Sequence, residues 1–541
     1  MKHMLAILLA LALCFGLLPV QAEEAWADAT RIVLSDEGVT VNGEAAPTDE
    51  SAAVYTANDI VFYLAGQDFT YGEGTEAEGH TQEEADAHTV VHITQPGTYV
   101  LSGSLSAGQV AVEMEDGKKD PDAVVTLVLN GVDITCSVAP AVIFYNVYEC
   151  CEADEETAAM TVDTAAAGAN VIIADDTVNN ITGSHVARIY EPGTVKLSED
   201  GTEVEDADKL HKYDAAFYSR RTMNVNGGQK GTGVLNINAD NEGLDTELHL
   251  TINGGNINIF SGNDGINTNE DNVSVTTVNG GSLTITVHGA TGEGDGIDSN
   301  GWLVINGGTV TSAACGFSGD AGLDSDKGIW LNGGEVCATG NMFDHIAGGD
   351  APYAVFSFDG RIKGGSTITL KTEAGETAAE WTPANDFSYL VISGLAVQPG
   401  AYTLWQGETQ LAYTGTDVFA FGGKGGMTPP ELPEGMEPPE GFEMPEGMER
   451  PEGMEKPEGM KEPEGMEKPE GFDPSKMAPP EGMELPEGME RPDDDGRGFG
   501  GGRGFGGRHG GFGSQQSGEQ NTLFVITEEG GTYSGVGAVQ E

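Results

Sequence analysis

The sequence predicts an all-β fold whose main domain is a parallel β-helix, a solenoid in which each turn of the chain stacks on the one before. Three observations predict it: a tripeptide repeated at near-constant spacing, alternating apolar residues before each copy, and a second motif repeated between the copies. A repeat of this length cannot bury its apolar face alone, so it must stack on copies of itself. The tripeptide is Asn-Gly-Gly, and its first glycines, which are 27, 26, 27 and 26 residues apart, are Gly227, Gly254, Gly280, Gly307 and Gly333.

The residues before each tripeptide alternate in polarity, as expected of a strand with one buried face. Four and two positions before the first glycine stand pairs such as Leu250 and Ile252, or Leu303 and Ile305, and these are predicted to point inward. The residue between the two members of each pair is predicted to point outward. Asparagine and glycine suit the turn that follows, because both tolerate the positive φ of a sharp bend.

The regions before the repeats have their own signals. A charged start, a short apolar stretch and a small-x-small ending at Ala22 predict that residues 1–22 are a secretory signal peptide. Residues 23–87 hold short alternating runs separated by acidic turns, which predict N-terminal strands and a cap. Strand-like sequence then continues without a helical period, and we predict that residues 88–345 form the parallel β-helix.

The region after the repeats divides into three parts. Residues 346–425 are β-rich but lack the tripeptide, and they are predicted to form a small C-terminal β-module. Residues 426–520 hold a six-residue Pro-Glu-Gly-Met repeat and a Gly/Arg-rich stretch, which lack the apolar residues for a core and are predicted to be disordered. Residues 521–541 are predicted to be a terminal strand that returns to the β-module, so the low-complexity segment is a long insertion in that module.

The chain is strongly acidic, with 25 Lys and Arg against 87 Asp and Glu and a formal net charge of −62. This charge argues against direct binding of nucleic acid, and an anionic polymer would be repelled unless cations lay between it and the protein. No second apolar segment approaches membrane-spanning length. We therefore expect a secreted protein, extracellular or associated with the cell surface, with no membrane insertion after the signal peptide is removed.

A second motif lies between the tripeptides and mostly has the pattern acid, Gly, apolar, acid or amide. Its apolar residue is predicted to point into the solenoid, which leaves the two outer positions of the motif on the outside. Strands stacked about 4.8 Å apart would bring these oxygens together along one edge, and calcium takes roughly six to eight such ligands. Alternatively, these residues only satisfy tight turns. The predicted calcium ligands are Asp264, Asn267, Asp295, Asp298, Asp320 and Asp324.

Three further segments precede this motif in the order 97–103 (GTYVLSG), 128–134 (VLNGVDI) and 179–182 (NNIT). Together with the motif they resemble, over roughly residues 88–345, a bacterial family of secreted carbohydrate-binding β-helix proteins, whose clostridial type binds cellulose and polygalacturonate. The resemblance implies a right-handed parallel β-helix that carries calcium and is similar in fold to calcium-dependent pectate lyases. The calcium motif of those lyases, Asp-Asp-Gly-Phe-Asp in pattern, is matched in part by residues 294–298, where glycine replaces the leading acid.

Three side chains are candidates for carbohydrate chemistry. Trp302 and Trp330 are predicted to lie on the outside of adjacent turns, where they would stack on sugar rings or only cover a strand. Lys327 is a weak candidate for the base of a lyase reaction, in which calcium would acidify the proton that the base removes. Its alternative role is an ordinary surface pair with Asp326.

Three functions remain open on these observations. The one we expect is non-catalytic, calcium-dependent binding of an acidic or cellulosic polysaccharide, with calcium between the acidic edge and any uronate carboxylates. The second is a calcium-dependent polysaccharide lyase. The third is an adhesin or scaffold of the cell envelope, which would agree with the long low-complexity segment.

Overall fold

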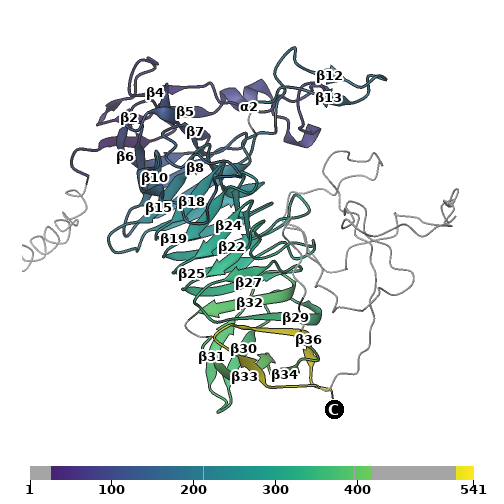
Figure 1. Ribbon diagram of the computed structural model, residues 1–541. Coiled ribbons are helices and arrows are strands. Elements are labelled where there is room, and N and C mark those ends of the chain that lie inside the picture. The colour runs from purple at the N-terminus through teal and green to yellow at the C-terminus, as the bar shows by residue number, and fades with distance from the viewer. Residues whose placement is uncertain (1–25, 211, 395–396, 417, 419–519, 541) are drawn as a thin grey trace, which may run out of the picture. The chain divides into compact units, whose positions relative to one another are not determined.

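The computed structural model describes residues 26–210, 212–394, 397–416, 418 and 520–540 (Figure 1). These residues belong to one unit, which joins Met1–Gly426 to Ser517–Glu541. The predicted signal peptide of residues 1–22 lies outside the described residues, and so does the predicted disordered segment of residues 426–520 except for its last residue.

Nearly all regular structure in the described chain is β-strand, which confirms the predicted all-β class. The helix α2 begins after Thr81, whose hydroxyl accepts a hydrogen bond from the Glu84 N–H at 3.2 Å while the Glu84 carboxylate accepts one from the Thr81 N–H at 2.7 Å. None of the helices in the described ranges has the length and apolarity needed to cross a membrane. These helices are η1 (Glu76–Glu78), α2 (Gln82–Asp86), η2 (Gly117–Lys119) and η3 (Thr164–Ala166).

Most of the strands lie in three stacks, within which successive strands pair in parallel (Figure 1). The first stack consists of β10 (Ala169–Ile173), β15 (Met223–Gly227), β18 (His249–Ile252), β21 (Val275–Val278), β24 (Trp302–Ile305), β26 (Ile329–Leu331) and β28 (Ile346–Gly348). The second consists of β11 (Val178–Gly183), β16 (Val234–Ala239), β19 (Asn256–Ser261), β22 (Ser282–Val287), β25 (Thr309–Ala313) and β27 (Glu335–Gly340). The third consists of β5 (Thr89–Ile93), β7 (Gly108–Glu113), β9 (Val142–Asn146), β14 (Ala215–Ser219), β17 (Glu242–Thr246), β20 (Ile266–Thr268) and β23 (Ile297–Ser299).

The chain passes through the three stacks in a constant order. It contributes β15, β16 and β17 to the first, second and third stacks, then β18, β19 and β20, and then β21, β22 and β23. Each passage returns the chain to the first stack one strand further along. Equivalent residues of successive passages therefore occupy neighbouring positions.

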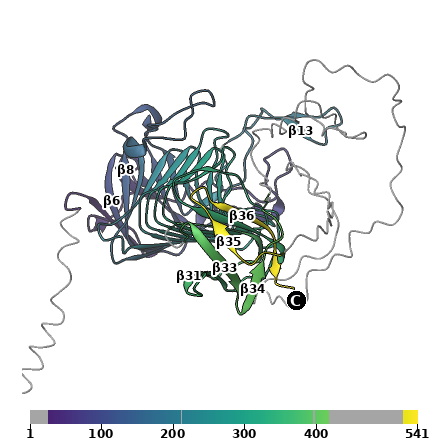
Figure 2. The same ribbon diagram turned by 60° about the horizontal axis from the view of Figure 1, so that its bottom comes forward.

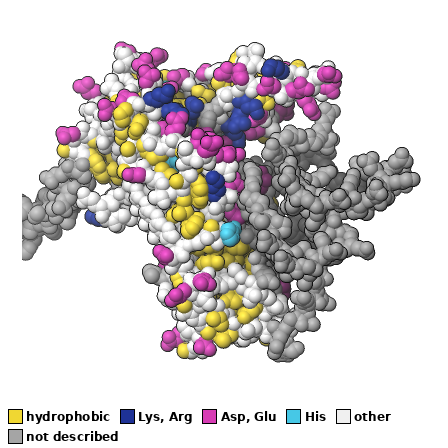
Figure 3. Space-filling view, viewed as in Figure 1, with side chains coloured by type: hydrophobic (Ala, Val, Ile, Leu, Met, Phe, Trp, Pro, Cys, Tyr) yellow, Lys and Arg dark blue, Asp and Glu magenta, His cyan; other side chains and the backbone are white. Residues whose placement is uncertain are grey.

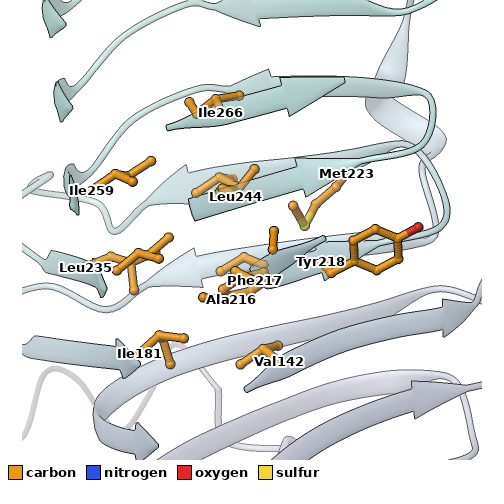
Figure 4. Packing of buried hydrophobic residues seen from close by; sticks show 14 of the residues in the cluster. Val142, Ile181, Ala216, Phe217, Tyr218, Met223, Leu235, Leu244, Ile259 and Ile266 are labelled. Atoms are coloured by element: carbon orange, nitrogen blue, oxygen red, sulfur yellow. The ribbon is translucent and has the colours of Figure 1, made fainter. Parts of the chain in front are cut away.

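The register of the first stack agrees with the prediction from the tripeptides. Met223 pairs with Leu250, Leu250 with Thr276, Thr276 with Leu303, and Leu303 with Ile329. All five side chains are buried. The core between the stacks is filled in the same way, and in Figure 4 Met223 of the first stack, Leu235 and Ile259 of the second, and Phe217 and Leu244 of the third all contribute to it.

The outward row of the first stack is partly covered, which the alternating pattern does not predict. The side-chain amide of Asn224 donates a hydrogen bond to the Thr164 carbonyl at 2.8 Å, and the hydroxyls of Thr164 and Thr251 are 2.9 Å apart. Thr164 belongs to η3, a segment that precedes the covered strands in the sequence. Asn224 and Thr251 are buried because this segment lies over them.

The asparagines of the tripeptides form a continuous hydrogen-bonded ladder. Each side-chain amide donates to the side-chain oxygen of the preceding asparagine: Asn253 to Asn226 at 3.0 Å, Asn279 to Asn253 at 2.9 Å, Asn306 to Asn279 at 2.9 Å and Asn332 to Asn306 at 2.8 Å. A carboxamide carries both a donor and an acceptor, so one column of a single residue type satisfies itself. The five tripeptide turns therefore lie in line.

The first strands cap the stacks. β1 (Thr30–Leu34) pairs in parallel with β6 (Gly97–Leu105), and β6 pairs with the long strand β8 (Val125–Thr135), which continues into both the first and second stacks. β4 (Val54–Ala57) closes the third stack by antiparallel pairing with β5. The remaining short strands of this region are β2 (Thr40–Val41), β3 (Glu44–Ala45), β12 (Lys196–Leu197) and β13 (Val204–Asp206).

The last strands form a module on the other end of the second stack, in which the pairing is antiparallel except between β29 and β36. β32 pairs antiparallel with both β27 and β29, and β35 and β36, drawn in yellow in Figure 2, pair with β33, β34 and β29. Phe356, Phe524 and Tyr533 meet in the core of this module, with ring centroids 4.9–5.5 Å apart. The strands are β29 (Tyr353–Ile362), β30 (Ile368–Thr372), β31 (Thr377–Trp381), β32 (Phe387–Gly394), β33 (Gly400–Gln406), β34 (Thr409–Ala412), β35 (Phe524–Ile526) and β36 (Gly531–Ala538).

The second glycine of a tripeptide is predicted to be sensitive to substitution because of the turn stacked beneath it. Gly281 has a φ of +85°, and a Cβ there would overlap the Gly255 carbonyl oxygen, whereas Gly292 has a φ of +100° with no atom near its Cβ position. A positive φ costs an L-residue about 1–2 kcal/mol, and overpacking adds about 1–3 kcal/mol. Gly281→Ala should therefore lower the free energy of unfolding in urea clearly more than the control Gly292→Ala does. Equal losses in the two variants would contradict the close stacking of the turns.

Candidate functional site

The acid-Gly-apolar motif lies on the third stack, in the register that the sequence predicts. Leu244 pairs with Ile266, Ile266 pairs with Ile297, and Ile297 forms a parallel bridge with Leu323. All four side chains are buried. The residue after each apolar one is consequently also aligned with its neighbours, as Asp245 is with Asn267.

The glycine of the motif is required by close packing. A Cβ on Gly243 would overlap Ile259, and one on Gly265 would overlap Ile285, both of which are core side chains of the second stack. The Cβ added to Gly265 would also lie 2.6 Å from the Gly296 carbonyl oxygen of the next turn. Only glycine allows the backbone to approach the core this closely.

The predicted ligands of successive turns are joined by hydrogen bonds. The Asp295 N–H donates to Oδ1 of Asp264 at 2.6 Å, the Ala321 N–H donates to Oδ1 of Asp295 at 2.5 Å, and the Gly294 N–H donates to Oδ2 of Asp320 at 2.7 Å. Each of these carboxylates therefore has one oxygen held by the backbone of a neighbouring turn. This arrangement fixes where the carboxylates lie without neutralising them.

Besides burial, the carboxylates of the acid-Gly-apolar motif raise one another's pKa values. Burial, and then the charges of Asp298 and Glu242, hold the pKa of Asp264 well above its usual range. Burial, and then Asp264, Asp324, Asp298 and Asp320 in turn, hold the pKa of Asp295 well above its usual range as well. Like charges brought together in this way resist ionisation unless a cation compensates them.

A second group of acids lies next to the predicted one, and the sequence analysis did not select it. One carboxylate oxygen each of Asp214, Glu242 and Asp245 lies within 4.8 Å of the other two, and all three residues are buried. Burial, followed by the charge of Asp214, raises the pKa of Glu242 to about 8. Lys212 approaches this group, with its Nζ 2.8 Å from Asp214 Oδ2, and one ammonium group cannot neutralise three carboxylates.

The sequence contained a signal for most of these missed residues. Glu242 and Asp245 are the outer positions of the first copy of the motif. Asp214 precedes the apolar Phe217 by three positions, as the predicted ligand Asp320 precedes Leu323. Asp344, whose Oδ2 accepts a hydrogen bond at 3.0 Å from the N–H of Ser325, the residue after Asp324, has no such signal. We call the whole set the acidic edge: Asp214, Glu242, Asp245, Asp264, Asn267, Asp295, Asp298, Asp320, Asp324 and Asp344.

Several oxygens of the acidic edge are buried without a hydrogen-bond donor among the described residues. Asp214 Oδ1, Glu242 Oε2 and Asn267 Oδ1 are three of them, and Asp324 Oδ1 and Asp344 Oδ1 are two more. Each unsatisfied buried oxygen costs about 1–3 kcal/mol, and native proteins rarely leave such groups without a partner. Oxygen atoms are the ligands that a hard cation such as calcium prefers, so the residues present fit the predicted ion.

The candidate sugar-binding and catalytic residues lie at the first stack. Trp302 and Trp330 are both half-buried. The ammonium nitrogen of Lys327 lies over the Trp302 ring, 4.3 Å from its centroid, and the Trp330 ring packs against Gly348. These contacts cover part of each indole, and they give Lys327 a cation–π partner.

The acidic edge predicts an unusual dependence of stability on pH in the absence of calcium. Burial first, and then nearby carboxylates, raise the pKa of Asp324 to about 7 and that of Glu242 to about 8, and burial raises that of Asp344 to about 6. The folded chain then holds protons that the unfolded chain has already released above about pH 4.5, so stability falls as pH rises through these values. In a chelator the melting temperature should therefore fall between about pH 5 and 8, and saturating calcium should remove most of that fall.

A matched variant separates this effect from that of His185. Burial lowers the pKa of His185, but hydrogen bonds to Asp240 and Glu78 outweigh it and raise that pKa to about 9, so His185 also loses stabilising power as pH rises. Glu242→Gln/Asp324→Asn should flatten the profile in chelator, whereas His185→Gln should leave the calcium effect intact. A melting temperature in chelator that does not change with pH would contradict the electrostatics described above.

Comparison with known proteins gives one family and one similar solved structure. A family model described as "Carbohydrate-binding domain-containing protein" matches residues 87–394, more than half of the chain. The chain is also similar to a solved structure of the polysaccharide lyase-like protein from C. thermocellum, in its gadolinium derivative. The two sequences are 21% identical, the TM-score is 0.33, and the match covers 60% of this chain and 93% of that one. No curated protein matches the chain.

Proposed function

Since the chain belongs to the family of carbohydrate-binding domain-containing proteins, we propose that it binds an acidic polysaccharide through calcium held on the acidic edge, without cleaving it. The observation that carries this proposal is a set of buried oxygens on the acidic edge that have no hydrogen-bond donor among the described residues, together with the close approach of the Asp214, Glu242 and Asp245 carboxylates. The unpartnered oxygens belong to Asp214, Glu242, Asn267, Asp324 and Asp344. Bound calcium would supply the positive charge that this edge and an anionic glycan both require.

The charge of the whole chain supports the same conclusion. With 87 acidic residues against 25 basic ones, the protein repels a polyanion over most of its surface. A glycan that carries carboxylates would associate with the acidic edge only if cations separated the two sets of charges. This requirement makes binding through the edge dependent on a divalent cation.

Two further statements belong to this proposal. The constant order in which the chain visits the three stacks supports a parallel β-helix, and the family resemblance of the sequence implies that it is right-handed. The signal-peptide pattern of residues 1–22 supports a secreted protein, either extracellular or attached to the cell surface. A glycan-binding solenoid would meet its polysaccharide there.

Binding to polygalacturonate is predicted to depend on calcium. Affinity should be at least tenfold higher in calcium than in chelator, because the ion offsets the repulsion between the edge and the polymer. The variant Asp295→Asn/Asp298→Asn should lose this gain, while Glu199→Gln/Glu205→Gln, which removes the same charge from exposed positions elsewhere, should retain it. Isothermal titration calorimetry measures both. Equal affinity with and without calcium would refute the proposed role of the edge.

The protein is also predicted to leave the polysaccharide intact. Lys327, the candidate base, is held over the Trp302 ring, and a base must instead reach the proton that it abstracts. Incubation with calcium and polygalacturonate should therefore release no unsaturated uronate that absorbs in the ultraviolet. Release that disappears in Lys327→Ala would establish the lyase function in place of binding.

A further inference from the structure

A groove of about 650 Å³ lies on the outer side of the third stack, among its first strands. Side chains of β5, β7 and β9 line it, together with η2 and the residues that follow β14. The groove shares no residue with the acidic edge. It is therefore a separate feature of the same stack.

Cations gather at this groove although the chain is poor in them. Four of the 25 Lys and Arg residues line it: Lys118, Lys119, Arg220 and Arg221. On the face drawn in Figure 3, most Lys and Arg side chains, in dark blue, lie toward the end with the N-terminal strands, among many Asp and Glu side chains in magenta. Because the chain has more than three acidic residues for each basic one, these four basic side chains indicate a function for the groove.

The two arginines are not used in ion pairs. No nitrogen of Arg220 or Arg221 lies within 4.0 Å of a carboxylate oxygen of the described residues. The Nε atoms of both are buried and have no acceptor in the described part of the chain. Among the described residues, the guanidinium group of Arg221 donates only to the Arg220 carbonyl at 2.8 Å and to Asn146 Oδ1 at 3.5 Å.

The arginines also repel each other. Burial, and next the charge of Arg220, lower the pKa of Arg221. Two neighbouring guanidinium groups with unused donors in a groove form an arrangement that an anion would stabilise. A carboxylate is a close geometric match, because a guanidinium offers it two parallel N–H donors.

The other side chains of the groove suit a sugar. Tyr145 and Tyr213 lie edge to face with their ring centroids 5.3 Å apart, and tyrosine rings offer an apolar surface with a polar end. Four acids, Asp59, Glu113, Glu115 and Asp116, also line the groove, and carboxylates accept hydrogen bonds from sugar hydroxyls. The same acids would disfavour a more highly charged anion such as phosphate or sulfate.

We propose that this groove is a second saccharide site, in which Arg220 and Arg221 bind the carboxylate of an acidic sugar directly, with no metal ion between them. The proposal rests on the proposed function for the class of ligand but uses different residues and the opposite electrostatics. On the acidic edge, an added cation is needed to hold the glycan. In the groove, the guanidinium groups themselves supply the positive charge.

Trigalacturonate, titrated by calorimetry in excess chelator, tests this second site in the full chain. Circular dichroism first confirms that each protein is folded under these conditions. The wild type should bind, and Arg220→Gln/Arg221→Gln should bind at least tenfold more weakly. Arg220→Lys/Arg221→Lys, which keeps the charge but loses the paired donors, should bind a few-fold more weakly. Lys196→Gln/Lys230→Gln, which removes two exposed cations elsewhere, should bind as the wild type does.

Three results would overturn the proposal: no binding of trigalacturonate by the wild type in chelator, equal binding of its fully methyl-esterified form, or competition by inorganic sulfate at the same concentration as the sugar. The Arg-to-Lys variant keeps the test valid if the glutamine variant does not fold. Failure of this site and failure of the acidic edge are distinguishable. If the groove is not a site, trigalacturonate does not bind in chelator. If the acidic edge is not a site, calcium does not raise the affinity for polygalacturonate.

Discussion

Parallel pairing in register is the constraint on which the rest of this structure depends. It places the equivalent side chain of each passage of the chain about 4.8 Å from its neighbours, so any residue type that is repeated becomes a column. Apolar columns make the core, and Met223, Leu250 and Leu303 belong to one of them. Polar columns behave according to their chemistry, and the two kinds in this protein differ sharply.

The asparagine ladder and the acidic edge are both columns of equivalent residues on successive passages of the chain, but the consequences of stacking are opposite. Asn253 and Asn279 each donate to one neighbour and accept from the other, so their column is satisfied by itself. Asp264 and Asp295 carry only acceptors when ionised, so they take backbone N–H groups, and burial and mutual repulsion raise their pKa values. A ladder of amides satisfies its own hydrogen bonds, whereas a ladder of carboxylates resists ionisation unless a cation compensates the charges.

The sequence predicted those features that repeat, because a period carries information about neighbours in space. The inward register at Leu250 and Leu303 followed from the tripeptides, and the position of Asp295 followed from the second motif. Asp214 was missed because its copy of the motif is degenerate, with Ala215 and Tyr218 at the outer positions. The groove and the cover over Thr251 could not be predicted, since each brings together segments from distant parts of the chain with no common period.

The pairing of β35 and β36 has a consequence for how the chain is made. These strands close the core around Phe356, yet the ribosome adds them long after β29–β34. Until β35 and β36 are synthesised, β29 and β33 have unpaired edges, which can form hydrogen bonds with other extended chains. The stacks can assemble progressively as they are synthesised, but the terminal module is completed late, so its assembly is the step at which an emerging chain is most exposed to misassociation.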